Sequence, residues 1–498
     1  MSDPKTFDVT PKYSKFRQAI RRYAPSELLP VLSAHAAKHL DPFSGQTAEN
    51  WGRGFAPWFY SGVARESIVY GNEFRSRPVT ETDILDLRNL FVFAPSGIED
   101  SSPDEPIMAK FVQSHSSEQF PYQTGAKHEL ARSYLLFAND MDDGGQPSFP
   151  RPDDWVPVLG GTISEALSAS FVFAVGAHKN GGIVDPGWLD ALWFEELESV
   201  LPRSVAADIL DRLSATVEQA KEDARKVIRG PFDSPKYAYN PLVRTPILDL
   251  GASQRFAPQP YFIHTAMTPE NLYYKGIRVW EPNAFGRAVG LRVQDYVGRQ
   301  LRHTGELDVR AEFRWVKNKS GGMDSSDWFV VTPSATILIE CKSVRMSPEM
   351  RGGTQEGLAL TAQRLTKAYE QLNANVLQIR AGNPAFNHLP NERPLIGLVV
   401  TSEPMYGANS PEVREMLPAA ELPILTISLR DVETLAVLPP DVLGEALYSL
   451  VGRETETYML SFGLRDVLPE GFEIPENALL DQAYKDAILP RLRNYEEV

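Results

Sequence analysis

The sequence predicts an α+β protein of several domains, in which a mostly α-helical N-terminal domain precedes an α/β domain with a central mixed sheet flanked by helices. Three observations lead to this class. The chain has 498 residues, more than one hydrophobic core usually covers. Apolar residues recur at helical spacing through the first half, and β-branched runs alternate with long amphipathic segments after about residue 300. We divide the chain into a helical domain (1–235), a proline-rich connector (236–282), an α/β domain (283–445) and a C-terminal extension (446–498).

The helical domain is predicted from segments that place their apolar residues on one face. These segments are 16–23, 26–40, 81–91, 126–137, 163–175, 188–200 and 205–228. Ser204 is a candidate N-cap for the last segment, whose stretch QAKEDARKV places acids and bases three and four residues apart. By analogy alone, we assign this domain a role in sensing a signal or binding a partner protein.

The connector and the C-terminal extension carry weaker patterns. Residues 230–260 hold several prolines and little periodicity, which is typical of a packed connector. Residues 446–498 include aromatic residues and are too hydrophobic for a disordered tail. We expect this extension to pack on the α/β domain or to form a contact between subunits of a homo-oligomer.

The α/β domain is predicted element by element from its periodicity. Apolar residues at helical spacing follow Pro282 as far as Leu301, and residues 307–316 alternate as a strand. A long amphipathic helix is predicted from Leu358 to Ile379, ended by a glycine and a proline. Two apolar runs predict buried strands, LIGLVVT (395–401) and LPILTISL (422–429).

Between the two long helices, the segment SSDWFVVTPSATILIECKS (325–343) predicts a β-hairpin. Residues 328–331 form one β-prone run, Thr-Pro-Ser supplies turn chemistry, and residues 336–339 form a second run rich in β-branched side chains. The turn is short, so the start of the first strand is expected beside the end of the second.

Charged residues lie at these two strand ends. Asp327 opens the first strand, and Glu340 and Lys342 close the second. Because side chains alternate along a strand, Glu340 and Lys342 share a face while Cys341 points away. The three charged groups are therefore expected at one edge of the sheet. The alternative is a solvated cross-strand pair on an ordinary hairpin.

This combination of side chains suits phosphodiester hydrolysis. Two neighbouring carboxylates repel each other unless a divalent cation neutralises them, and hard oxygen ligands favour Mg²⁺ or Mn²⁺. A neighbouring lysine can orient or deprotonate a water and offset charge that develops on a phosphate. We therefore expect Mg²⁺ or Mn²⁺ as the cofactor.

The pattern resembles the signature of the PD-(D/E)XK nuclease superfamily, whose fold is called restriction-endonuclease-like. That signature is an aspartate, a β-turn-β segment and Glu-x-Lys at the end of an apolar strand, matched here by Asp327 and by Glu340-Cys341-Lys342. The flanking helices and strands follow in the family's order, so the resemblance covers about residues 283–435. It implies that Asp327 and Glu340 are metal ligands and that Lys342 is the catalytic lysine.

The sequence departs from the family pattern in two places. Many relatives carry a glutamate on the first helix that adds a metal or water ligand, whereas here Gln294 occupies that place, with Asp295 beside it. We favour Gln294 as the fourth catalytic residue because it borders the apolar stripe, and Asp295 would serve if the helix were rotated by about 100°. The Gln-x-x-x-Tyr motif of some exonuclease-type relatives is absent, because Leu365 lies four residues before Tyr369. An endonuclease is therefore favoured.

The net charge of −15 contrasts with the basic surface that most proteins use to bind nucleic acid. Basic residues nevertheless exceed acidic ones around the predicted site, between residues 278 and 319. Ordinary surface charge is an equally good reading of this excess. The candidate phosphate-binding residues are Arg287, Arg292, Arg314, Lys317, Lys319 and Arg345.

Taken together, the sequence predicts a DNA-directed endonuclease, which by analogy would act in defence against foreign DNA. The alternatives are an RNA-directed nuclease of the same fold and a non-catalytic protein that uses this fold to bind nucleic acid. The single cysteine, Cys341, excludes an internal disulfide, and no apolar run is long enough to span a bilayer. We therefore expect a cytoplasmic protein without a membrane partner.

Overall fold

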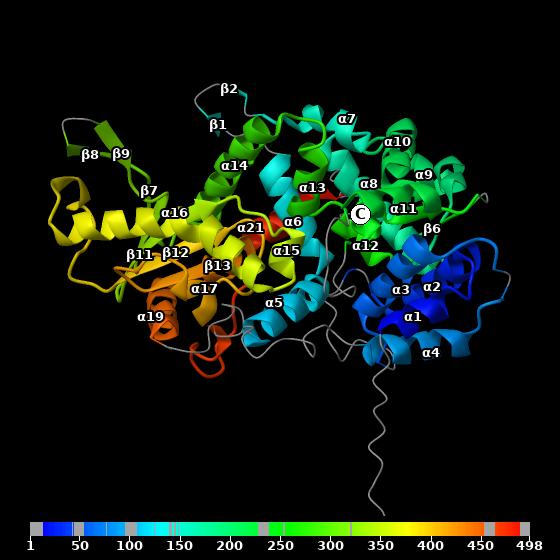
Figure 1. The fold of residues 1–498 in the computed structure, drawn as a ribbon. Coiled ribbons are helices and arrows are strands. Elements are labelled where there is room, and N and C mark those ends of the chain that lie inside the picture. The colour runs from blue at the N-terminus through cyan, green and yellow to red at the C-terminus, as the bar shows by residue number, and fades with distance from the viewer. Residues whose placement is uncertain are drawn as a thin grey trace, which may run out of the picture.

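The structure is a computed structural model that describes residues 13–41, 43, 54–75, 77–94, 107–123, 125–138, 142–143, 146–147, 149–227, 239–251, 254–318, 321–452 and 464–488. Its fold is α+β, as predicted: helices predominate, and strands form a five-stranded mixed sheet and a smaller four-stranded sheet. The first helices lie at one side of the molecule and the five-stranded sheet at the other (Figure 1).

Four N-terminal helices pack around a core that is completed by residues from later in the chain, such as Leu248 and Phe262. Aromatic rings fill it, with Phe91 in edge-to-face contact with Phe16 at 5.3 Å and with Phe59 at 5.9 Å between ring centroids. The helices are α1 (Tyr13–Ile20), α2 (Pro25–His39), α3 (Pro57–Tyr70) and α4 (Glu81–Val92).

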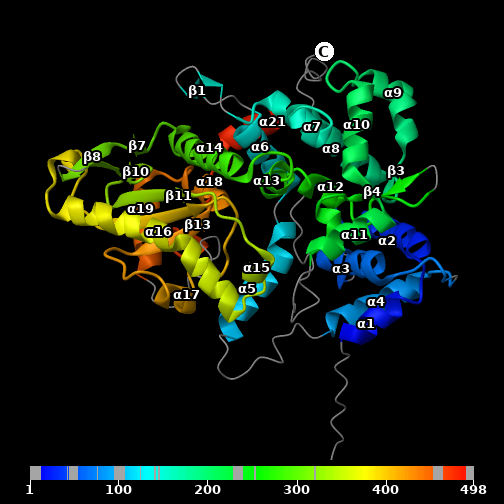
Figure 2. The same cartoon turned by 45° about the horizontal axis from the view of Figure 1, so that its top comes forward.

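A second group of elements follows in the chain, of which α5 and α6 lie between the N-terminal helices and the large sheet, while α9 and α10 lie on the side away from the sheet (Figure 2). The segment predicted as a helix over 188–200 contains only one α-helical turn, α9. The elements of this group are α5 (Ile107–Gln119), α6 (Ala126–Phe137), β1 (Asp142–Asp143), β2 (Gln146–Pro147), α7 (Val156–Leu159), α8 (Ile163–Lys179), α9 (Leu192–Glu195), α10 (Arg203–Leu213) and α11 (Val217–Val227).

The helix predicted over 205–228 is interrupted by a strand, so that prediction is wrong at its centre. Ser214 Oγ donates to the carbonyl of Leu210 at 2.7 Å, and Thr216 Oγ1 accepts from the N–H of Gln219 at 3.2 Å. Such side-chain bonds compete with helical ones and favour helix ends. The strand joins a small sheet of order β3-β6-β5-β4, formed by β3 (Ile183–Val184), β4 (Ser214–Thr216), β5 (Ile247–Asp249) and β6 (Arg255–Phe256).

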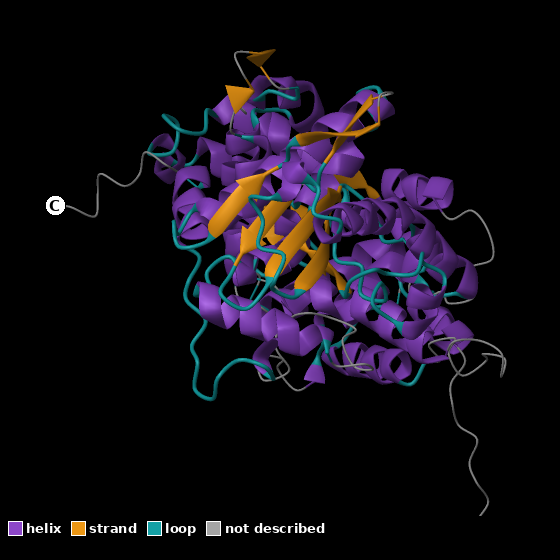
Figure 3. Ribbon diagram, turned by 90° about the vertical axis from the view of Figure 1, so that its left-hand side faces the viewer, coloured by secondary structure: helices purple, strands orange, loops and turns teal. Residues whose placement is uncertain are grey.

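The large sheet, drawn in orange at the centre of Figure 3, has the order β13-β12-β11-β10-β7. β7, β10 and β11 form an antiparallel meander, and β12 and β13 add in parallel. The connector contributes α12 (Tyr261–Thr265) and α13 (Pro269–Gly276) before the sheet begins. The sheet and its two main helices are α14 (Pro282–Arg302), β7 (Asp308–Ala311), β10 (Trp328–Val331), β11 (Thr336–Lys342), α16 (Gln355–Arg380), β12 (Leu395–Thr401) and β13 (Ile424–Ser428).

The single strand predicted over 307–316 is two strands in the structure. After β7 the chain leaves the sheet, and β8 (Arg314–Asn318) pairs instead with β9 (Gly321–Asp324) in a separate hairpin. Two hydrogen bonds between Phe313 and Ser325 fix the base of this hairpin. The Phe313 N–H donates to Ser325 Oγ at 2.9 Å, and the Ser325 N–H donates to the Phe313 carbonyl at 2.9 Å. Backbone pairing outside the sheet thus replaces the predicted continuation of β7.

The two faces of the large sheet contribute to different cores. Ile337 and Ile339 of β11 are buried in a core that includes Val293 of α14, whereas Leu338 is buried in a core that includes Leu365 of α16. The strand alternation predicted from the sequence therefore separates two buried layers. The core on the α14 side continues into α6, α8 and α10 of the helical region.

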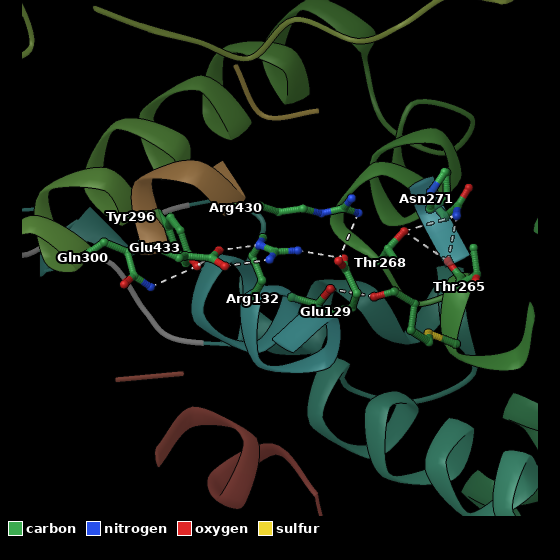
Figure 4. Close-up of polar contacts among 12 residues, drawn as sticks. Glu129, Arg132, Thr265, Thr268, Asn271, Tyr296, Gln300, Arg430 and Glu433 are labelled. Carbon is green, nitrogen blue, oxygen red and sulfur yellow. Dashed lines mark hydrogen bonds and ion pairs between the residues drawn. The ribbon is translucent and has the colours of Figure 1, made fainter. Parts of the chain in front are cut away.

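Buried ion pairs join α6 to the sheet-bearing part (Figure 4). Arg132 of α6 bonds to Glu433 of α18 (Leu429–Leu435) at 2.7 Å and to Glu129 at 2.7 Å, and Arg430 pairs with Glu129 at 3.0 Å. Tyr296 of α14 donates to the same Glu433 at 2.5 Å. Removing one partner from such a buried network leaves an uncompensated charge, so these contacts hold the two parts in one arrangement.

The remaining helices surround the sheet. α21 contacts both parts of the chain, because Asn477 at its N-terminus donates to Gln300 at 2.9 Å while Ser168 of α8 donates to the Ala487 carbonyl at 3.1 Å. These helices are α15 (Pro348–Arg351), α17 (Pro411–Glu415), α18 (Leu429–Leu435), α19 (Pro440–Val451) and α21 (Ala478–Ala487).

None of the described helices is by itself long and apolar enough to cross a membrane. One bent pair, Pro152–Leu159 with Ile163–Lys179, satisfies length and composition criteria together. Its apolar residues, including Ile163, Leu167 and Phe173, are buried in the core on the α14 side.

Candidate active site

The predicted hairpin is present and its register is fixed by the turn. β10 and β11 pair antiparallel from Trp328 opposite Ile339 to Val331 opposite Thr336. Thr332 closes the turn, since its N–H donates to the Ala335 carbonyl at 2.9 Å and its Oγ1 accepts from the Ala335 N–H at 3.0 Å. The turn residues expected from the sequence therefore set which strand ends meet.

Asp327 is held beside the end of β11 by a backbone hydrogen bond. Its Oδ2 accepts from the N–H of Cys341 at 2.6 Å. Cys341 lies between Glu340 and Lys342, so this bond places the aspartate next to both residues. The predicted convergence of Asp327, Glu340 and Lys342 at one sheet edge is what the structure contains.

Glu340 and Lys342 lie on the face of the sheet that packs against α16. Lys342 Nζ donates to Glu340 Oε1 at 2.7 Å and to Gln371 Oε1 at 2.8 Å. The Glu340 side chain is only 2% exposed, whereas the Lys342 side chain is 20% exposed. The Lys342 side chain is therefore partly exposed to solvent, whereas the Glu340 side chain is enclosed by protein.

Both carboxyl groups hold their protons more tightly than usual. Burial raises the pKa of Asp327 to about 6, with a further contribution from Glu312, against the bond from Cys341 and the charge of Lys342. Burial, and then the charge of Asp327, raise the pKa of Glu340 to about 7. Two crowded, desolvated carboxyl groups of this kind need a positive charge to ionise together.

The site was tested for its fit to a divalent cation. Glu340 Oε2 is buried and has no hydrogen-bond partner within the described part of the chain, and an unpaired buried carboxylate oxygen is costly unless a cation or donor reaches it. No group of three or more His, Cys, Asp or Glu side chains forms a ready-made metal cage among the residues described. Mg²⁺, however, is commonly held by one or two carboxylates together with water and substrate phosphate. Asp327 and Glu340 fit that mode of binding.

Gln294 makes no hydrogen bond to Asp327, Glu340 or Lys342 among the described residues and reaches Glu312 instead. Its Nε2 donates to Glu312 Oε2 at 3.2 Å, and its backbone carbonyl accepts from Trp328 Nε1 at 2.9 Å. The neighbouring Asp295 instead pairs with Arg299 at 2.8 Å. Gln294 is thus the residue of the two that is directed toward the meander, although its bond is to Glu312 rather than to Asp327.

Two residues of the site were not found by sequence reasoning. Glu312 follows β7, and its N–H donates to the Asp327 carbonyl at 2.9 Å, so it is next to the aspartate. Gln371 on α16 accepts the second hydrogen bond of Lys342. Glu312 could have been found from the register of the meander. In the structure Ala311 pairs with Trp328, and an antiparallel meander drawn in that register places the next residue, Glu312, beside Asp327.

The predicted phosphate-binding residues divide into three groups. Arg287 and Arg314 are exposed, and Arg345 is half-buried with its guanidinium 4.3 Å from the centre of the Tyr273 ring. The side chain of Lys317 and the whole of Lys319 lie outside the described residues. Arg292 contradicts the prediction, because it is buried.

Arg292 is buried and serves the interior rather than the surface. It is 1% exposed, and its guanidinium donates to the carbonyls of Leu136 at 2.8 Å and Pro150 at 2.6 Å. A cation so enclosed cannot contact a nucleic acid. The helical periodicity of α14 did not reveal that α6 and the segment before α7 cover this position.

No protein-family model, curated protein or solved structure matches the chain.

Proposed function

We propose that the protein is a divalent-metal-dependent nuclease that hydrolyses phosphodiester bonds of DNA. The observation that carries the proposal is the pair of the half-buried Asp327 and the buried Glu340, which has an unpaired carboxylate oxygen, next to the partly exposed side chain of Lys342. Charged groups at the end of a central strand rarely serve packing, and perturbed carboxyl pKa values in such a place favour a catalytic role.

The order of the elements supports a restriction-endonuclease-like domain. A helix (α14) precedes the antiparallel meander β7-β10-β11, a second helix (α16) follows, and β12 joins β11 in parallel. This order agrees with the family that the motif resembles. The helices cover opposite faces of the sheet and leave the carboxyl end of β11 as the place for the chemistry.

Each residue of the site has a distinct task in this proposal. Asp327 and Glu340 would hold a Mg²⁺ or Mn²⁺ ion, which supplies positive charge and lowers the pKa of bound water. Lys342 donates a hydrogen bond toward the attacking water or the phosphate and offsets negative charge that develops there. Gln371 accepts one Lys342 hydrogen bond and so fixes the direction of the ammonium group.

DNA is the proposed substrate by analogy with the family that the motif resembles, and exposed arginines could contact its phosphates. Arg287 on α14 and Arg314 on β8 can contact phosphates without disturbing the core. The protein as a whole carries a net charge of −15, so we expect weak binding that falls steeply with salt.

The test is cleavage of supercoiled plasmid DNA, and of single- and double-stranded RNA, by the purified full-length protein with Mg²⁺, Mn²⁺ or EDTA. Lys342→Ala is compared with Lys367→Ala, a lysine exposed on α16. DNA cleavage that needs metal and Lys342 but not Lys367 supports the proposal. Cleavage of RNA alone would identify an RNA-directed nuclease, and DNA binding without cleavage would identify a binding platform.

A further inference from the structure

A cavity of about 490 Å³ lies between the helical region and the sheet-bearing part, and it does not include Asp327, Glu340 or Lys342. Residues of α3, α6, α12, α13 and the loop after β12 line it. Figure 4 shows part of its wall, where Thr265, Thr268 and Asn271 lie near Glu129 and Arg430. Its volume falls within the range of small-molecule sites, about 300–1,000 Å³.

One end of the cavity is cationic. Lys275 is 9% exposed, and its Nζ donates to the Arg244 carbonyl at 3.3 Å. Among the described residues no carboxylate lies within ion-pair distance of Lys275 or of Arg278, whereas Arg244 pairs with Asp223. Burial, followed by the charges of Arg244 and Arg278, lowers the pKa of Lys275 to about 7. A buried cation without a counter-ion, such as Lys275, is costly, and an anionic ligand would remove that cost.

The other end of the cavity is acidic. Arg430 pairs with Glu129 at 3.0 Å, and Arg351 pairs with Glu403. Burial, and then the charge of Glu129, raise the pKa of Glu270, and Glu270 has no ion-pair or hydrogen-bond partner among the described residues. Glu270 and Lys275 are five residues apart on α13, which separates them by about 7.5 Å along the helix axis. The two ends thus offer opposite chemistry to one ligand.

Aromatic side chains line the space between these ends. Tyr274 lies between Glu270 and Lys275 in the sequence of α13, and its hydroxyl donates to the Met346 carbonyl at 3.3 Å. Tyr122 is in ring contact with Tyr261 at 5.3 Å and with Trp58 at 6.4 Å between centroids. Aromatic walls bind nucleobases of any sequence through their faces.

We propose that this cavity binds a nucleotide, with its phosphate at Lys275 and Arg278 and its base among the aromatic side chains. Glu270 would accept a hydrogen bond from a ribose hydroxyl or an exocyclic amine. A purely apolar ligand would leave Lys275 without a counter-ion, and inorganic phosphate would leave the aromatic wall unused. The same phosphate-and-base chemistry is offered by a free nucleotide and by the 5′-phosphorylated end of a strand.

The proposal is tested by isothermal titration of the full-length protein, without metal or DNA, with each of the four ribonucleoside 5′-monophosphates. Adenosine and inorganic phosphate serve as the half-ligands. We expect at least one nucleotide to bind more tightly than either half-ligand. Absence of binding by all four nucleotides, or equal binding by adenosine or phosphate, would overturn the proposal. Because no cleavage is measured, this result is independent of the proposed nuclease activity.

Variants locate the binding and competition identifies its source. Lys275→Gln and the exposed Arg278→Gln should each weaken nucleotide binding by roughly tenfold or more, as the loss of one charge-assisted hydrogen bond predicts. Lys38→Gln, an exposed lysine of α2 outside the cavity, should leave it unchanged. The assignment would be overturned if both variants bound the nucleotide as tightly as the wild type, with the melting temperature of Lys275→Gln equal to that of the wild type. Displacement of the nucleotide by a 5′-phosphorylated oligonucleotide supports a strand end as the ligand, and no displacement supports a free nucleotide.

Discussion

Asp327 Oδ2 accepts a 2.6 Å hydrogen bond from the backbone N–H of Cys341, the residue between Glu340 and Lys342. This one bond joins the start of β10 to the end of β11. It fixes the aspartate where the strand alternation has already placed the glutamate and the lysine on a common face.

Glu340→Gln should stabilise the metal-free protein at alkaline pH. In the folded chain Glu340 keeps its proton up to about pH 7, whereas its ordinary pKa is 4.5. The resulting stability is fully present below about pH 4.5 and is lost as the pH rises to about 7. Glutamine cannot ionise, so the variant should exceed the wild type in free energy of unfolding by about 1–3 kcal/mol at pH 8.

This stability difference is measured by urea unfolding at pH 5 and pH 8 in EDTA. The difference should shrink at the lower pH, because the wild-type carboxyl group is then protonated. Glu370→Gln, an exposed glutamate of α16, is the matched control and should change stability at neither pH. Equal unfolding curves for Glu340→Gln and wild type at pH 8 would contradict the burial argument.

Binding of Mn²⁺ should release protons near neutral pH. The raised pKa values of Asp327, about 6, and Glu340, about 7, mean that a cation displaces protons from the free site. We expect roughly one proton per ion at pH 6 and few at pH 9. Titration calorimetry in two buffers of different ionisation enthalpy measures this number. Proton release that does not depend on pH would place the metal elsewhere.

Gln371→Leu should slow cleavage without weakening DNA binding. Gln371 touches Lys342 and not the metal ligands, so its loss should leave the ammonium group poorly oriented. We expect kcat to fall about tenfold with KM unchanged, as is common for residues that position a catalytic group. Gln363→Leu, at an exposed position of the same helix, is the control. A change in KM alone would show that Gln371 acts in binding instead.

Substitution of Arg292 should lower stability, whereas substitution of Arg287 should weaken DNA binding. Arg292→Met removes buried bonds to the Leu136 and Pro150 carbonyls, so we expect about 2–4 kcal/mol of lost stability. Arg287→Ala changes an exposed side chain, so we expect weaker DNA binding and a smaller salt dependence with no change in unfolding. Chemical unfolding and binding at several salt concentrations distinguish the two. Weaker DNA binding with unchanged stability in Arg292→Met would show instead that Arg292 contacts nucleic acid.

Strand alternation and turn chemistry made the centre of the site predictable. β12 occupies Leu395–Thr401, the run predicted from the sequence, because a parallel strand buried on both faces is continuously apolar. Asp327, Glu340 and Lys342 could be placed together because a short turn leaves little freedom in the register of β10 and β11.

Contacts made at long range could not be predicted in the same way. Glu312 reaches the site through the register of β7, which depends on where the chain leaves the sheet for the β8–β9 hairpin. Gln371 reaches it through the rotation of α16 against the sheet. Arg292 is enclosed by a segment more than a hundred residues away in the sequence. Helical periodicity reports the apolar face of α14 but not which neighbour covers each polar position.

The most direct test of the central claim is the rate of Mg²⁺-dependent relaxation of supercoiled plasmid by Asp327→Asn, measured beside Asp324→Asn and the wild type at equal melting temperature. Asp324 is an exposed aspartate at the end of β9, three residues before Asp327. Each variant therefore loses one carboxylate from the same part of the chain. We predict that the wild type and Asp324→Asn relax the plasmid and that Asp327→Asn is slower by roughly 100-fold or more. Equal rates for the two variants would contradict a metal-dependent nuclease centred on Asp327, Glu340 and Lys342.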